Sequence, residues 1–165
     1  MDDAPATPKG GLARAAELLT LLGGVVLVAV ALLVVLSVAG RYVFGRPIEG
    51  DYELVEMGMA VAIFLCFPHT HASGSNLVAE FFSSGLSDRK KLALDILADA
   101  VFAVVAATFT WRLAIGLTRK FTQHDTTMLL QIPVWIAYGF AVASMAMLTL
   151  VCLWRAADEI ARLRK

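Results

Sequence analysis

Charged side chains are scarce in this chain. Of its 165 residues, 17% are Asp, Glu, Lys or Arg, and 59% are hydrophobic. A soluble domain averages about 45–50% apolar residues, so the excess here must face something other than water. Acidic and basic residues balance at 14 each, and no basic patch is interleaved with aromatic residues. The composition therefore gives no sign of a nucleic-acid partner.

Cysteine and histidine are also too few, and too far apart, to suggest a metal site. Cys66 and Cys152 lie alone in apolar runs, without a CxxC pair or a zinc spacing, so we interpret both as small apolar residues. His69 and His71 point to different faces of a helix, and we predict that they lie at a helix end in the membrane interface. We therefore predict no catalytic residue, no metal site, no cofactor and no enzyme activity.

The chain also lacks the signs of a complete secondary transporter. Such proteins commonly show inverted repeats, with helix breaks at matching places in two halves. Neither feature is visible in this sequence. This absence favours an accessory subunit over a complete carrier.

Four long apolar runs predict an all-α integral membrane protein with four transmembrane helices. About 20 apolar residues are enough to cross a hydrocarbon core of about 30 Å. We place the spans at 18–40, 54–72, 92–111 and 132–154. A polar tail, 1–17, precedes them, and 155–165 is expected to extend the last helix into water. The aromatic residues expected to anchor the membrane interfaces are Tyr42, Trp111, Trp135, Tyr138 and Trp154.

The segment 76–86, between the second and third spans, is too short to cross a membrane. Its apolar residues recur at helical spacing, which predicts a short helix lying in the interface. Asn76 and Glu80 would lie on its polar side, and Phe81 and Phe82 on its apolar side. Lys and Arg residues are more numerous on the side of the two termini, which predicts that both termini are cytoplasmic.

Two acids inside the third span are its clearest polar signal. Asp95 and Asp99 are one turn apart on one face, and ionisable groups within a membrane usually face protein or water. One hypothesis is a proton or ion site. The other is structural: Asp95 pairs with Lys91 near the interface, and Asp99 needs a basic or polar partner on another helix or subunit.

More acids gather where the second span begins. Asp51 and Glu53 are expected in water, either as helix caps or as a docking site for a basic surface of a partner. Glu56 lies one turn deeper and is expected to pair within a complex, with Arg112 as one candidate. The candidate subunit or helix contacts are Glu56, Asp99, Arg112 and the small pair Gly139 and Ala143.

Four short motifs follow one another along the chain. They are RYVFGRPI at 41–48, GDYELVE at 50–56, NLVAEFF at 76–82, and IPVW at 132–135 followed by Ala137 and Tyr138. In this order and spacing they resemble the small membrane subunit of tripartite ATP-independent periplasmic (TRAP) transporters. The resemblance covers nearly the whole chain after the N-terminal tail. One departure is that no basic residue follows Ser75 until Arg89, where relatives often carry one nearer the histidine.

The resemblance implies a scaffold role in a multi-pass complex of the bacterial inner membrane. A large membrane subunit would carry the sodium and substrate sites, and membrane lipid would surround the complex. A periplasmic solute-binding protein would deliver a carboxylate-type solute. Two alternatives stay open: a self-sufficient proton-coupled exporter using Asp95 and Asp99, and a membrane haem or redox module using His69 or His71.

Overall fold

The computed structural model describes residues 11–73 and 88–163, and within these it gives no side-chain placement for 88–93, 95, 159, 162 and 163. The described residues form four long helices: α1 (Gly11–Phe44), α2 (Asp51–Ala72), α4 (Asp88–Thr122) and α5 (Trp135–Leu163). Each helix contains a stretch long and apolar enough to cross a membrane, which confirms the predicted fold class. The predicted interfacial helix, with Asn76, Glu80, Phe81 and Phe82, lies outside the described residues.

The helices extend beyond the apolar runs that predict them. α1 begins at Gly11 rather than near Leu18, and it continues to Phe44, beyond the predicted end of the span at Gly40. α4 has 35 residues, or roughly 52 Å at 1.5 Å per residue, against about 30 Å of hydrocarbon. The apolar run marks where a helix meets lipid, whereas backbone hydrogen bonds continue through the polar residues at its ends.

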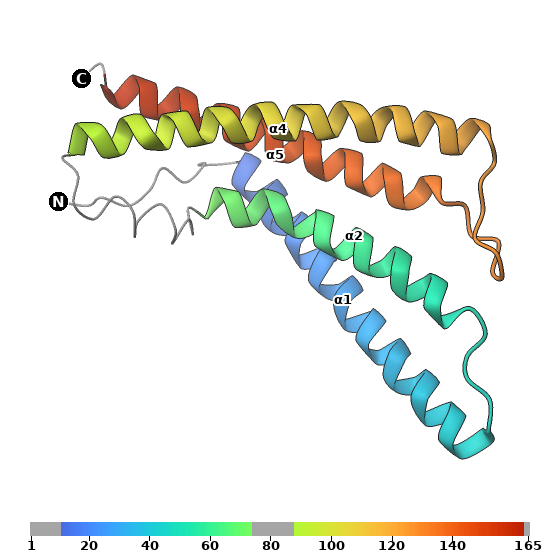
Figure 1. The fold of residues 1–165 in the computed structure, drawn as a ribbon. Coiled ribbons are helices and arrows are strands. Elements are labelled where there is room, and N and C mark those ends of the chain that lie inside the picture. The colour runs from blue at the N-terminus through green and yellow to red at the C-terminus, as the bar shows by residue number, and fades with distance from the viewer. Residues whose placement is uncertain (1–10, 74–87, 164–165) are drawn as a thin grey trace.

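The helices form two antiparallel pairs that meet along α2 and α5 (Figure 1). α2 lies between α1 and α5, and α5 lies between α2 and α4. α1 and α4 therefore occupy opposite edges of the assembly. The α1–α2 and α4–α5 connections share one end of the molecule, which we call the loop end, although α1 diverges there from the α4–α5 pair (Figure 1). At the opposite end α2 and α5 finish and α4 begins.

Small residues set the close approach of α1 to α2. The buried residues of α1 recur every seven positions, which is typical of a seam between two helices: Ala16, Gly23, Val30 and Ser37. A Cβ atom on Gly23 would lie 3.0 Å from the carbonyl oxygen of Ala62 and 3.0 Å from Leu65 Cβ. A Cβ atom on Gly58 would collide with the Val30 side chain. Larger residues at these two positions would therefore hold the two helix axes further apart.

The second core lies between α4 and α5. Its buried members are Ala103, Ala106, Met145, Leu148 and Cys152, and Phe64 of α2 packs against them. Buried Cys152 thus behaves as the small apolar residue that the sequence suggests. Nearer the loop end, Tyr138 covers Gly116, so this expected interface anchor is half-buried between helices.

Much of the apolar surface remains uncovered. Many Leu and Val side chains of α1 are exposed, and so are large apolar residues of α4 such as Val101, Val104 and Phe109. A soluble monomer rarely leaves apolar patches of this extent in water. These faces are suited to lipid or to a partner in the membrane.

Candidate functional site

Three ionisable side chains meet in the interior where α2 ends, and we call them the charged cluster: His71, Asp99 and Arg155. Each is almost fully buried, with 6%, 2% and 5% of its surface exposed. Arg155 Nε donates to Asp99 Oδ2 at 3.0 Å, and His71 Nε2 lies 3.1 Å from Asp99 Oδ1. The carboxylate of α4 therefore accepts a hydrogen bond from α5 on one oxygen, and its other oxygen lies next to the imidazole ring of α2.

Arg155 also completes the end of α2. Its Nη1 donates to the backbone carbonyl of His71 at 2.8 Å. The last four carbonyls of a helix lack partners within that helix, and the negative end of the helix dipole favours a cation. One guanidinium thus neutralises Asp99 and caps α2, which joins three helices at one point. The ring of Phe102 lies over the His71 ring, with centroids 5.2 Å apart.

The structure corrects two expectations about this cluster. Arg155 was expected in water, at the start of the polar extension 155–165, but it is buried on Asp99, because α5 passes between α2 and α4 at this depth. His71 was expected at the membrane interface, but it is enclosed by the same packing. Asp99 finds its basic partner on another helix of its own chain. The side chains of Lys91 and Asp95, and hence their expected pairing, lie outside the described part of the chain.

A second polar contact joins the two helix pairs at the loop end. Both carboxylate oxygens of Glu53 accept backbone N–H groups, from Leu129 at 2.7 Å and from Leu130 at 2.9 Å. These amides belong to a tight loop that Thr127 closes through its hydrogen bonds with the backbone of Ile132. Glu53 therefore fixes the α4–α5 loop against the start of α2.

Asp51 is also engaged within the chain. Its Oδ2 accepts the hydroxyl of buried Ser37 at 2.5 Å, and its Oδ1 accepts the backbone N–H of Tyr52 at 2.8 Å. The Ser37 oxygen in turn accepts the backbone N–H of Ile48 at 3.3 Å. Both carboxylates therefore hold loops in place, Asp51 at the start of α2 and Glu53 against the α4–α5 loop. Sequence reasoning missed Ser37, whose signal is its polarity within an apolar run.

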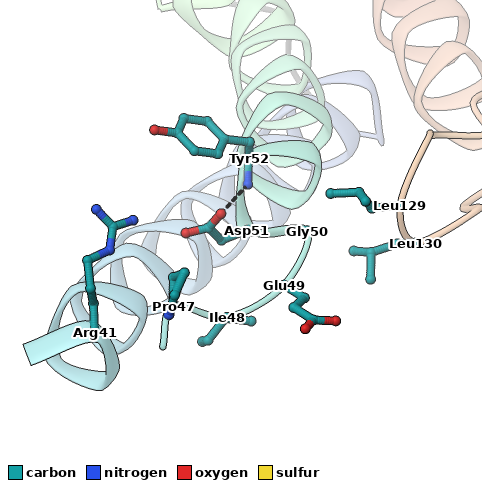
Figure 2. A pocket seen from close by; sticks show the side chains of 9 residues that line it. All are labelled: Arg41, Pro47, Ile48, Glu49, Gly50, Asp51, Tyr52, Leu129 and Leu130. Carbon is teal, nitrogen blue, oxygen red and sulfur yellow. Dashed lines mark hydrogen bonds between the residues drawn. The ribbon is translucent and has the colours of Figure 1, made fainter. Parts of the chain in front are cut away.

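A hollow of about 330 Å³ opens between the two loops (Figure 2). It is lined by Arg41, Pro47, Ile48, Glu49, Gly50, Asp51, Tyr52, Leu129 and Leu130. A second hollow, of about 400 Å³, also lies near this end and is lined by Leu117, Thr118, Phe121, Thr122 and Trp135. In the described part of the chain, no group of His, Cys, Asp or Glu residues is arranged to hold a metal ion.

The remaining predicted contacts are not brought together within this chain. Glu56 and Arg112 are both exposed, and no ion pair joins them among the described residues. A Cβ atom on Gly139 would meet nothing within 4 Å, and Ala143 is exposed, so this small pair packs against none of the four described helices. Of the expected anchors, Tyr42, Trp111 and Trp135 are exposed and Trp154 is half-buried.

Comparison with known proteins assigns the chain to a family. The family model described as "Tripartite ATP-independent periplasmic transporters, DctQ component" matches residues 30–162. That region begins within α1 and contains all of α2 and α4 and nearly all of α5, including the charged cluster. No match was found among curated proteins or among solved structures. The chain therefore belongs to the DctQ family of TRAP transporter components.

Proposed function

We propose that this chain is the small scaffold subunit of a TRAP-type secondary transporter. It would pair with a large membrane subunit that carries out sodium-driven uptake of a carboxylate-type solute. A periplasmic binding protein would supply the solute, and the complex would lie in the bacterial inner membrane with both termini of this chain cytoplasmic. The family match supports the assignment to this transporter type.

The observation that carries the scaffold role is the enclosure of the charged cluster. A transported ion or proton needs a path to its binding group, but Asp99 is 2% exposed and accepts a hydrogen bond from buried Arg155. The two hollows described above lie toward the loop end, away from this cluster. A buried polar contact that joins several helices rigidifies the fold. The cluster is thus suited to holding helices together.

The alternatives lose support from the same contacts. A self-sufficient exporter using Asp99 would need this carboxylate to exchange partners, although Arg155 holds it in the interior. A haem or redox module using His71 would need room for the cofactor at the ring, whereas His71 is 6% exposed and its Nε2 lies 3.1 Å from Asp99 Oδ1. Docking of the binding protein by Asp51 and Glu53 stays a prediction, and variants of either residue will loosen a loop as well.

Reconstitution tests the proposal. Proteoliposomes would contain this chain with the large membrane subunit, and the binding protein would be added outside with a labelled carboxylate solute. We expect uptake that requires a sodium gradient and both membrane subunits. As a control, this chain alone should support no uptake. Transport by this chain alone, or full uptake by the large subunit without it, would contradict the scaffold role.

A further inference from the structure

α2 leaves one narrow face uncovered along its whole length, although it lies between two other helices. Within α2, the exposed residues are spaced three or four apart and form what we call the α2 stripe: Tyr52, Glu56, Met59, Ile63, Phe67 and Thr70. Residues three and four apart lie on the same side of a helix. All other residues of α2 are buried or half-buried.

The α2 stripe is unsuited to facing lipid because it contains an acid. Glu56 is exposed and lies in the second turn of α2, between Tyr52 and the apolar residues Met59 and Ile63 along the stripe. Ionisable residues within membrane helices usually face protein or a water-filled space, since a lipid-facing charge is costly. The exposed face of α1, by contrast, carries no charge from Leu18 to Gly40. α1 can therefore face lipid at no such cost.

We propose that a helix of the large membrane subunit packs along the α2 stripe and places a Lys or Arg side chain opposite Glu56. This inference rests on the proposed function, and it names the surface and the chemistry of the partner. The spacing of three and four residues is that of a helix–helix seam. The charge of Glu56 requires a cation at that depth, and the described part of this chain supplies none.

A second copy of this chain fits the stripe poorly. Symmetric pairing of two copies in a membrane brings the same surface of each together at the same depth. Glu56 would then lie close to Glu56 of the other copy, and like charges repel. Charge complementarity therefore favours a different chain with a basic residue.

Site-specific photo-crosslinking tests the surface. A crosslinking amino acid would replace Ile63 or Phe67 in the stripe, and Leu32 of α1 as the exposed apolar control. The chain would be expressed with a tagged large subunit in intact membranes. We expect crosslinks to the large subunit from Ile63 and Phe67 but not from Leu32. The inference is overturned if only Leu32 reacts, or if the stripe reacts only with lipid or with a second copy.

Charge reversal tests the partner. We expect Glu56→Lys to reduce the large subunit recovered with this chain by about tenfold, as loss of a desolvated charge pair would. Glu49→Lys, an exposed acid of the neighbouring loop, should change recovery little. Replacing the facing Lys or Arg of the large subunit by Glu should restore recovery with Glu56→Lys.

The two proposals fail in different ways. If the wild-type chain recovers no large subunit, the proposed function fails. If the wild-type chain and Glu56→Lys recover it equally, only the inference about the stripe fails. Glu56 is exposed and makes no ion pair or side-chain hydrogen bond among the described residues, so the isolated Glu56→Lys chain should unfold at the wild-type temperature. If the variant is folded, loss of the complex can be attributed to the interface.

Discussion

Asp99 and Arg155 form a buried ion pair between α4 and α5, with 3.0 Å between Oδ2 and Nε. They are 56 positions apart in the sequence, and each also contacts His71 of α2. Burying two charges is costly, and their attraction offsets that cost only when the remaining hydrogen bonds are made. Here a second guanidinium nitrogen donates to the His71 carbonyl, and the His71 ring lies 3.1 Å from the second carboxylate oxygen. The pair fixes one arrangement of three helices.

Removing one partner of this pair should destabilise the chain. We expect Arg155→Met or Asp99→Ala to cost about 3–5 kcal/mol of unfolding free energy, because the other charge is left buried without compensation. The control is Arg112→Met, since Arg112 is an exposed arginine without an ion pair in the described chain, and this variant should unfold like the wild type. Thermal unfolding of the purified protein in detergent measures each. Wild-type stability of both single variants would contradict the role of the pair.

Replacing both Asp99 and Arg155 should show how much of the lost stability comes from leaving one charge buried without its partner. Asp99→Leu with Arg155→Met replaces the pair by apolar side chains, which often recovers stability lost in single variants. We expect the double variant to unfold at a higher temperature than either Asp99→Leu or Arg155→Met. The transport rate of the whole complex should rise and fall with the unfolding temperature of the variant. Loss of ion coupling in a stable, assembled Asp99 variant would instead point to a transport role for Asp99.

Replacing Glu53 should release the α4–α5 loop. Glu53→Ala removes the acceptor of two exposed backbone amides, which would then bond to water and leave the loop without its contact to α2. We expect hydrogen exchange at the amides of Leu129 and Leu130 to become about tenfold faster or more. Glu53→Gln keeps one acceptor oxygen, so its exchange rates should lie between those of the wild type and Glu53→Ala. Glu49→Gln is the control, and unchanged exchange in Glu53→Ala would mean that the contact does not order the loop.

Two adjacent glycines of α1 should respond differently to alanine. A Cβ atom on Gly23 meets the backbone of Ala62 and Leu65 Cβ at 3.0 Å, whereas one on Gly24 meets nothing within 4 Å. We expect Gly23→Ala to cost about 1–3 kcal/mol through overpacking. Gly24→Ala should be neutral or stabilising by up to about 1 kcal/mol, since alanine favours helix over glycine. Equal unfolding temperatures for the two variants would contradict the α1–α2 crossing.

The four spans and the distribution of Lys and Arg predict the topology. A reporter fused after Lys165 should be cytoplasmic, and one inserted near Gln123 should be periplasmic. The activity of alkaline phosphatase, which folds only outside the cytoplasm, measures this in cells. Finding both positions on the same side of the membrane would remove the four-span arrangement.

Much of the fold could be predicted because a long apolar run indicates directly which segment of the chain lies in lipid. The runs starting near Leu18 and Ile132 each lead to a long helix, and the charge inside the third run makes Asp99 conspicuous. The sequence also indicates that Asp99 needs a partner on another element. These inferences are local, since each depends on a segment and the solvent around it.

The identity of the partners could not be predicted in this way. Arg155 reaches Asp99 only because α5 lies between α2 and α4, and no local pattern sets that order of helices. The same holds for Glu53, whose partners are backbone amides 76 and 77 positions away. Backbone groups carry no residue type, so such an acceptor contact leaves no signal in the sequence. The sequence therefore did not indicate that Glu53 holds the α4–α5 loop.

Because α5 lies between α2 and α4, its position affects the order in which the helices can assemble during synthesis. Chains are synthesised from the N-terminus, so α2 and α4 are made before the helix that holds them together. Asp99 enters the nascent membrane domain without its cation, and the carbonyl of His71 lacks the same guanidinium. The three helices can therefore be joined at this point only after α5 has been synthesised and Arg155 has reached both groups.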